Sequence, residues 1–187
     1  MEYKDASLSK YLDDLSAKLA APGGGSAAAM NAAMGISLVS MVINFTLGKP
    51  KYAEHEFELK KLLEKSEKLR QEFLNLVDLD VKAYKSKNLR NALHIPFMVA
   101  RLCFEGAGLC PPLIRKGNVN LISDVAVAAI MLESAFASAY FNVEINLKGL
   151  GDQKLAQIIR KELKQKAMKI MKIRLETEEK VGEIIRG

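Results

Sequence analysis

Residues 122–147 read ISDVAVAAIMLESAFASAYFNVEINL, a stretch of apolar and helix-forming residues that carries only three charged side chains. A helix that is apolar around most of its surface must be covered on more than one side. We therefore expect this stretch to form a helix at the centre of the fold or in a subunit interface.

Further helices are expected on both sides of this stretch. Asp152 is a good N-cap for a strongly charged helix that reaches almost to Arg186. Residues 97–104 are also expected to be helical. Ile95-Pro96 marks a boundary before them, because a residue that precedes proline avoids the α region. The breaks after this helix are Gly106, Gly108, Pro111-Pro112 and the turn Gly117-Asn118.

The first 85 residues predict three more helices. Ser7 caps the first, whose apolar positions recur every three or four residues. The second covers about residues 26–47, is rich in alanines that allow close helix packing, and ends at Lys49-Pro50. The third is the charged, amphipathic stretch 53–85. The second helix carries one apolar stripe, made of Met30, Met34, Leu38, Met41 and Phe45.

The composition agrees with an all-α protein. The chain has 187 residues, of which 49% are hydrophobic but only 6% aromatic, with no Trp. Strands favour aromatic and β-branched residues, whereas this mixture of Ala, Leu, Ile, Met and Lys suits helices. We expect a bundle of long antiparallel helices that forms a single domain over residues 1–187 and is dimeric, because helix faces rich in Ala, Ser and Met pack closely.

Several features bear on the compartment. The two cysteines, Cys103 and Cys110, make no disulfide framework, which is typical of a reducing compartment. The first residues lack the basic start and apolar run of a secretory signal. Apolar runs such as 125–132 are too short to span a bilayer alone. We expect a cytoplasmic protein without a membrane partner.

The positive charge is uneven along the chain. The net charge is +6, and residues 148–187 contribute +5 of it, from 11 Lys or Arg against 6 Asp or Glu. Such a surface attracts anions: nucleic acid, acidic lipid or a polycarboxylate ligand. A solvated helix face is the simpler explanation for most of these lysines. Nucleic acid is not expected, because the basic residues lack interleaved aromatic residues and a known motif.

Residues 22–29, PGGGSAAA, form the first pattern with chemical meaning. Glycines that lead into a helix expose free amide groups at the positive end of the helix dipole, where an anion or a carbonyl oxygen binds well. The Gly-Lys-Ser/Thr ending of a phosphate-binding loop is missing. A tight turn that lets two helices approach closely is the alternative.

Two further polar patterns lie at the ends of the apolar helix. Residues 117–124, GNVNLISD, offer Asn120 or Ser123 as a cap and place Asp124 in the first turn, where the dipole favours a carboxylate. Their combination suggests a polar site at the rim of the core. At the other end, Asn142 and Asn146 are four residues apart and share one face. They either take part in a site or satisfy buried backbone groups.

These blocks occur together in one known family. PGGGS with its alanine-rich helix, LGKPKYAE, LVDLDVKAY, GNVNLISDVAVAA and NVEINLK follow each other over nearly the whole chain. In this order they resemble the formimino-tetrahydrofolate cyclodeaminase and methenyl-tetrahydrofolate cyclohydrolase family. The resemblance implies a helical bundle that dimerises and holds a folate in a groove where the subunits meet. Members expel ammonia from formimino-tetrahydrofolate to close the methenyl ring, or open that ring with water.

The resemblance also suggests roles for particular residues. Asp80 corresponds to the catalytic acid or base, and burial against apolar helices would raise its pKa toward the useful range. The alternative is an exposed helix acid. Asp78, two residues away, is expected to be solvated. The substrate-binding residues implied are Gly24, Gly25 and Ser26 beside the pterin or its substituent, Asn118, Asn120 and Asp124 on the pterin ring, Lys49 and Lys51 on the glutamate tail (polyglutamylated or not), and Asn142 and Asn146.

No metal and no cofactor besides the tetrahydrofolate substrate is expected. His55 and His94 are far apart in sequence, and no Cys/His spacing is typical of a zinc site.

The chain departs from the family pattern at one place. Residues 83–90 join the Asp80 block almost directly to the next helix, where the family has a longer connection. Either this loop is deleted, or residues of the natural chain are missing from the sequence. A true deletion favours the rival function, a non-catalytic folate-binding or structural helical module.

Overall fold

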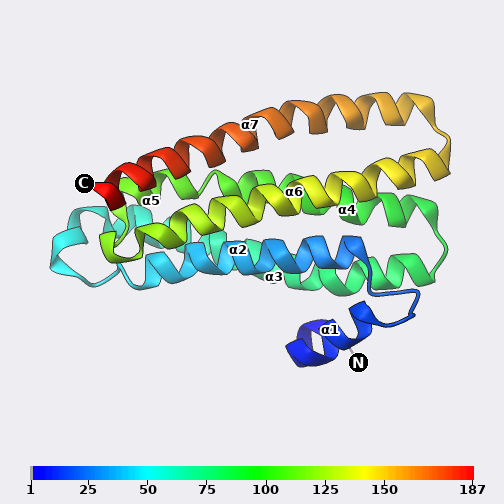
Figure 1. Cartoon of the computed structure of the whole chain (residues 1–187), viewed down its shortest axis with the longest axis horizontal. Helices are drawn as coiled ribbons and strands as arrows, with labels where there is room; N and C mark the ends of the chain where they lie inside the picture. Colours follow the sequence, from blue (N-terminus) through cyan, green and yellow to red (C-terminus); the bar gives the residue numbers. More distant parts are fainter. Residues whose placement is uncertain (1) are drawn as a thin grey trace.

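The computed structural model describes residues 2–187, which are helical almost throughout and contain no strand. Five long helices lie lengthwise in a bundle, and the chain turns back at each end of it (Figure 1). They are α2 (Gly24–Asn44), α3 (Glu56–Lys85), α4 (Leu89–Ala107), α6 (Ile122–Leu150) and α7 (Gln153–Arg186). The shorter elements are η1 (Tyr3–Asp5), α1 (Leu8–Ser16), η2 (Pro50–His55), α5 (Cys110–Lys116) and η3 (Val119–Leu121). The all-α prediction is confirmed.

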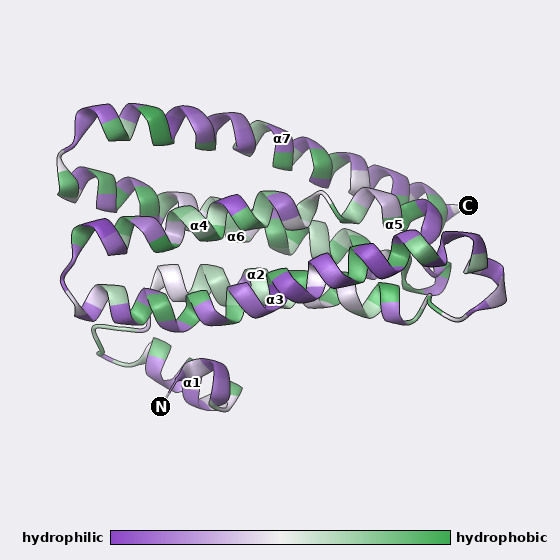
Figure 2. Ribbon diagram, turned by 180° about the vertical axis from the view of Figure 1, so that it is seen from behind, coloured by the Kyte–Doolittle hydropathy of each residue, from purple (hydrophilic) through white to green (hydrophobic). Residues whose placement is uncertain are grey.

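The apolar helix α6 contacts α2, α4, α5 and α7, so it occupies the expected central position. Its buried side includes Ala128, Ala129, Leu132 and Ala135, none of which is exposed. The outer helix α7 is instead mostly hydrophilic (Figure 2) and packs one face on α6.

The alanines of α2, not its apolar stripe, face the core. Ala29, Ala32 and Ile36 are fully buried, whereas Met34 is 46% exposed and Phe45 57% exposed. Small side chains allow the neighbouring helices to approach, as predicted. Ile36, Val39 and Ile43 are buried with them, whereas Met34 and Phe45 of the predicted stripe remain on the surface.

The boundary expected at Ile95-Pro96 is wrong, because Pro96 lies inside α4. Proline lacks an N–H, so the carbonyl of Ala92, four residues earlier, loses its helical donor. The side-chain amide of Asn146 on α6 replaces it, with Nδ2 donating to Ala92 O at 2.7 Å. This interhelical hydrogen bond is why α4 continues through the proline.

The expectation that the apolar runs are too short to span a bilayer considered unbroken runs and not whole helices. Gly24–Asn44, Leu89–Lys116 and Val119–Leu150 are each long and apolar enough to cross a membrane by length and composition. Unbroken apolar runs in these helices are short, since Ala, Gly and Ser separate the larger apolar residues. Only 39% of the apolar 18-residue window within Val119–Leu150 is buried, so α6 keeps a broad uncovered surface.

This uncovered surface joins that of α2 to form one apolar face, which we call the α2–α6 face. Asn31 on α2 ties the two helices together by donating from Nδ2 to Met131 O and to Ser134 Oγ on α6. The exposed apolar side chains of this face are Met34, Phe45, Val127, Ile130, Phe141 and Ile145.

Candidate active site

The carboxyl group of Asp80, near the end of α3, lies directly against the first turn of α2. A Cβ atom placed on Gly25 would be 2.2 Å from Asp80 Oδ1 and 2.7 Å from its Cγ. No side chain of any kind fits between these two elements. Gly25 is therefore the residue that lets the carboxylate reach the start of the helix.

The environment of Asp80 raises its pKa to about 6, because partial burial disfavours the charged form. The backbone N–H of Ser26, in the turn that Asp80 contacts, opposes this rise. Gly24, Gly25 and Ser26 form the first turn of α2, and the first helical hydrogen bond runs from Ala27 N to Gly23 O. Their amides thus have no partner within the helix and give Asp80 a positive neighbourhood.

A pocket of about 280 Å³ opens beside this carboxyl group. Two asparagines of α6 line it, and each has its amide nitrogen occupied: Asn142 Nδ2 donates to Ser138 O and Asn146 Nδ2 to Ala92 O. Each Oδ1 then remains as a hydrogen-bond acceptor. The lining residues are Ala20, Ala21, Gly23, Gly24, Gly25, Asp80, Tyr84, Ala92, Asn142, Ile145 and Asn146.

Two tyrosines at this site were not singled out from the sequence. Tyr84 lines the pocket and is largely exposed, one turn after Asp80. Tyr11 of α1 is only 2% exposed and donates its hydroxyl to Ser26 Oγ at 3.2 Å. The sequence did hold a signal for Tyr11: a tyrosine at a core position of an amphipathic helix needs a buried partner for its hydroxyl.

Ser26 is fully buried, and its side chain points to Tyr11 rather than to the pocket. Only the backbone N–H of this residue faces Asp80.

The expectation that Asp78 is solvated is wrong. Asp78 is 5% exposed and accepts from the backbone N–H groups of Tyr3 at 2.6 Å and Lys4 at 3.2 Å. A carboxylate is a strong acceptor for unpaired amides, and the N-terminal segment supplies two of them.

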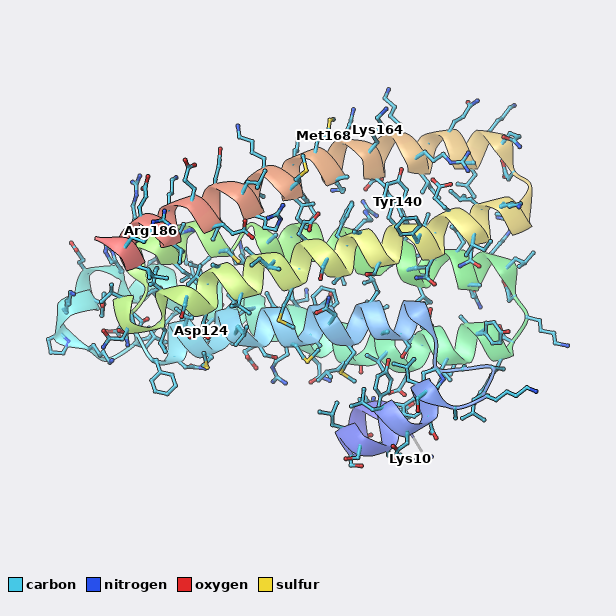
Figure 3. All side chains as sticks on the ribbon, in the orientation of Figure 1. Lys10, Asp124, Tyr140, Lys164, Met168 and Arg186 are labelled. Carbon is cyan, nitrogen blue, oxygen red and sulfur yellow. The ribbon has the colours of Figure 1, made fainter. Side chains whose placement is uncertain are left out.

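A second group of the expected site residues lies at the other end of the bundle, around the start of α6 (Figure 3). Asn118 is 5% exposed and links this turn to the end of α2: its N–H donates to Thr46 Oγ1 and its Nδ2 to Phe45 O. Its Oδ1 accepts from Asn120 N and so caps η3. The prediction that Asn120 or Ser123 caps the apolar helix is wrong, because the residue at the N-cap of α6 is Leu121 and no side chain in the described part of the chain caps this helix. Asp124 is half-buried. Lys49 and Lys51 are exposed and precede Tyr52, whose hydroxyl accepts from Val119 N in the turn before α6.

One protomer does not bring the two groups together. Asp124 and Asn142 are separated by 18 residues of the same helix, which corresponds to about 27 Å. The α2–α6 face runs between them, with Phe141 79% exposed beside the Asp80 end and Phe45 57% exposed beside the Asp124 end.

Among residues 2–187, no group of three or more His, Cys, Asp or Glu is placed to hold a metal ion. The carboxyl group of Asp80 has a pKa close to neutral pH and lies against the amides at the start of a helix. A helical bundle with such a group is equipped for proton transfer to a bound molecule.

The comparisons with known proteins identify the family. The formiminotransferase-cyclodeaminase family matches residues 7–87 and 85–165. A methenyltetrahydrofolate cyclohydrolase from Methylorubrum extorquens is 39% identical over 176 residues, covering 82% of this chain and 85% of that protein. The chain belongs to the formiminotransferase-cyclodeaminase family.

Two further relatives agree. The formimidoyltransferase-cyclodeaminase of Rattus norvegicus is 32% identical over 171 residues, and the match takes up 79% of this chain but 32% of that longer protein. The crystal structure of formiminotetrahydrofolate cyclodeaminase from Thermotoga maritima superposes with a TM-score of 0.90 at 29% identity, covering 98% of this chain and 100% of that one.

The two matched stretches meet at residues 85–87, in the short connection noted in the sequence. In the structure this connection is a formed turn between α3 and α4, in which Asn88 Oδ1 accepts from Arg90 N and Asn91 N. The break in the family match therefore coincides with the place where this chain joins two helices directly.

Proposed function

We propose that this protein is a folate enzyme of one-carbon metabolism that hydrolyses 5,10-methenyltetrahydrofolate to 10-formyltetrahydrofolate. The observation that carries the proposal is the Asp80 carboxyl group, which has a pKa of about 6 and faces a pocket beside the free amides of α2. A relative named for this activity aligns along most of the chain.

Asp80 supplies the proton transfers that this hydrolysis needs. As carboxylate, it accepts one proton from the water whose oxygen attacks the methenyl carbon. It then returns this proton to N5 of the folate as the bond between carbon and N5 breaks. The second proton of the water leaves to solvent, and the formyl group remains on N10.

The second candidate is cyclisation of formiminotetrahydrofolate with release of ammonia, the activity named for the solved structure that matches the whole chain. There Asp80 in its acid form protonates the formimino nitrogen as N10 attacks the formimino carbon. The carboxylate then takes the proton that N10 loses and passes it to the same nitrogen, which leaves as ammonia while the methenyl ring closes. This reaction needs the protonated carboxyl group, so its rate falls as pH rises above the pKa of Asp80, whereas the hydrolysis rate rises.

The site proposed here is shared between two copies of the chain. Its two groups of residues lie at opposite ends of the exposed α2–α6 face, about 27 Å apart along α6. A two-fold symmetric dimer of antiparallel bundles formed through this face places the Asp80 end of one protomer against the Asp124 end of the other. The second copy, rather than lipid, then covers Met34, Ile130 and Phe141.

In this arrangement the pocket asparagines and the first turn of α2 bind one side of the folate. Asn120 and Asp124 of the other protomer bind the donor groups of the pterin ring. Lys49 and Lys51 attract the glutamate tail, whether single or polyglutamylated. We expect a cytoplasmic homodimer that needs no cofactor besides its folate substrate and binds neither nucleic acid nor membrane.

Assay of the two substrates side by side, followed by the absorbance of the methenyl form, tests the activity. Asp80→Asn should abolish turnover, because the side-chain amide of asparagine neither accepts nor donates the proton that the reaction transfers. Glu64→Gln, an exposed acid on the same helix, should leave turnover unchanged. Tight folate binding by the wild-type protein without turnover of either substrate would instead support the non-catalytic module.

A further inference from the structure

The N-terminal segment, residues 2–16, packs beside Asp80 and is held there by its neighbour Asp78. Tyr3 N and Lys4 N both donate to the Asp78 carboxylate, which is almost fully buried. Two residues further along α3, Asp80 faces the pocket. One short piece of α3 therefore fixes the N-terminal segment with one carboxylate and carries the proposed catalytic one next to it.

Tyr11 connects this segment to the first turn of α2. Its ring stands edge-on to Tyr3, with ring centroids 5.3 Å apart and planes at 83°. Its hydroxyl donates to Ser26 Oγ at 3.2 Å, and both residues are almost completely buried. Ser26 follows Gly25, whose Cβ position lies against the Asp80 carboxyl group, and the Ser26 backbone N–H lowers the pKa of Asp80. A continuous chain of contacts thus runs from the N-terminal segment, through Ser26, to the carboxyl group.

We propose that Tyr11 is a positioning residue for Asp80, which acts by holding Ser26 and thereby the first turn of α2 against the carboxylate. The inference rests on the proposed catalytic role of Asp80 and extends it to a residue that does not line the pocket.

Ser26 requires such support because of where it lies. It is the third residue of α2, where the helix supplies no acceptor for its N–H, and the residues before it are Gly23, Gly24 and Gly25. Glycines have more backbone freedom than any other residue, so this turn is intrinsically loose. The Tyr11 hydroxyl holds the Ser26 side chain, which is the buried polar side chain of this turn.

Few other groups influence the charge of Asp80. Besides Tyr11 from α1, the titratable residue at the pocket is Tyr84 on α3 itself. The first turn of α2 contributes amides, α4 contributes Ala92, and α6 contributes the neutral Asn142 and Asn146. The Ser26 N–H is therefore the principal group that stabilises the ionised form.

Tyr11→Phe tests the inference because it keeps the ring and removes only the hydroxyl. With burial unchanged and the Ser26 N–H less firmly placed, the pKa of Asp80 should rise by about 0.5–1 unit. Two readouts follow it: the Asp80 side-chain carboxyl signal in ¹³C NMR, assigned by comparison with Asp80→Asn, and the pH dependence of kcat/KM. In Ser26→Ala, adding Tyr11→Phe should produce no further rise.

Tyr3→Phe is the matched control. It removes a tyrosine hydroxyl from the same segment, but this hydroxyl donates to Asp14 at 2.9 Å and not to Ser26. It should leave the Asp80 titration in place even where it lowers the melting temperature.

The NMR titration needs no turnover, so it separates this inference from the proposed function. If Tyr11→Phe lowers the melting temperature and the Asp80 titration stays where it was, Tyr11 is only structural and the inference is overturned. If the titration moves in a protein that turns over neither substrate, the positioning role stands and the catalytic proposal fails.

Discussion

At the residue scale, the raised pKa that suits Asp80 to proton transfer also lowers the stability of the folded protein at neutral pH. Its pKa is raised in the folded protein, from an ordinary value of 3.8 to about 6, because burial disfavours its charge. A raised pKa means that the folded state holds the proton more tightly than the unfolded chain. The contribution of Asp80 to the free energy of unfolding is therefore fully present below about pH 4, and it is lost as pH rises through about 6.

Asp80→Asn should therefore stabilise the protein at pH 7.5 while it removes activity. The full pKa difference corresponds to about 3 kcal/mol, and we expect about 1–2 kcal/mol because the carboxyl group is partly exposed. The melting temperatures of the two proteins at pH 4.5 and 7.5 check this. A gain that is as large at pH 4.5 as at pH 7.5 would show that the charge of Asp80 is not its cause.

Gly25→Ala should greatly lower turnover, since the new methyl group occupies the position of Asp80 Oδ1 and the α2 turn or α3 must shift. A displacement of about 1 Å commonly costs on the order of 100-fold in rate. Gly23→Ala, two residues earlier, is the control, because nothing lies within 4 Å of its added Cβ. Equal losses in kcat/KM for both variants would contradict the proposed contact.

At the scale of elements, the path of α4 depends on a residue of α6. Asn146 donates to the carbonyl that Pro96 deprives of its helical partner. Asn146→Ala leaves this carbonyl without its donor and should destabilise the protein by about 1–3 kcal/mol.

A second substitution tests the cause. Pro96→Ala restores a backbone N–H that can donate to Ala92 O within α4. In this background, Asn146→Ala should cost clearly less. Urea unfolding of the two single variants, the double variant and the wild type gives the coupling between the sites. If the changes in free energy of unfolding caused by the two substitutions add up in the double variant, Asn146 stabilises the protein in some other way.

The sequence predicted the elements better than their contacts. The apolar stretch 122–147 and the glycine-led helix at residue 24 follow from periodicity and from glycine, which are local properties. The boundary expected at Ile95-Pro96 failed because the compensating donor, Asn146, is 54 residues along the chain from the carbonyl of Ala92 that it satisfies. Asp78 was misjudged for the same reason, since its partners are the amides of Tyr3 and Lys4.

Several residues of the candidate site were predicted, but the pocket that they form was not. Asp80 was identified through the family resemblance, because an acid on an amphipathic helix is more often a surface group. Its pocket could not be foreseen, since only the tertiary fold places Gly25 and Asn142 beside it. The distance between Asp124 and Asn142, in contrast, follows from the rise of one helix and already implies that one chain cannot join them around a small ligand.

At the scale of the whole molecule, the α2–α6 face links the apolar surface to the proposed chemistry. It contains side chains as exposed as Phe141 and Ile145 and ends at a polar group on each side. Exposed apolar surfaces of this kind mark interaction sites. If the face forms a two-fold dimer, every active site takes Asp80 from one chain and Asp124 from the other, and the dimer has two such sites.

This arrangement predicts recovery of activity in mixed dimers. Asp80→Asn should be inactive, and Asp124→Asn should weaken folate binding by tenfold or more, since an amide donor replaces one acceptor oxygen at the pterin. When the two variants are co-expressed in equal amounts, about half of the dimers are mixed, and each mixed dimer has one intact site. Turnover should then return to about a quarter of the wild-type value, whereas two copies of Asp80→Asn give none. If the mixture turns over substrate no faster than the sum of its separate variants, each chain builds its site alone.

If Asp124→Asn binds folate normally and only melts at a lower temperature, Asp124 is an acid that stabilises the first turn of α6.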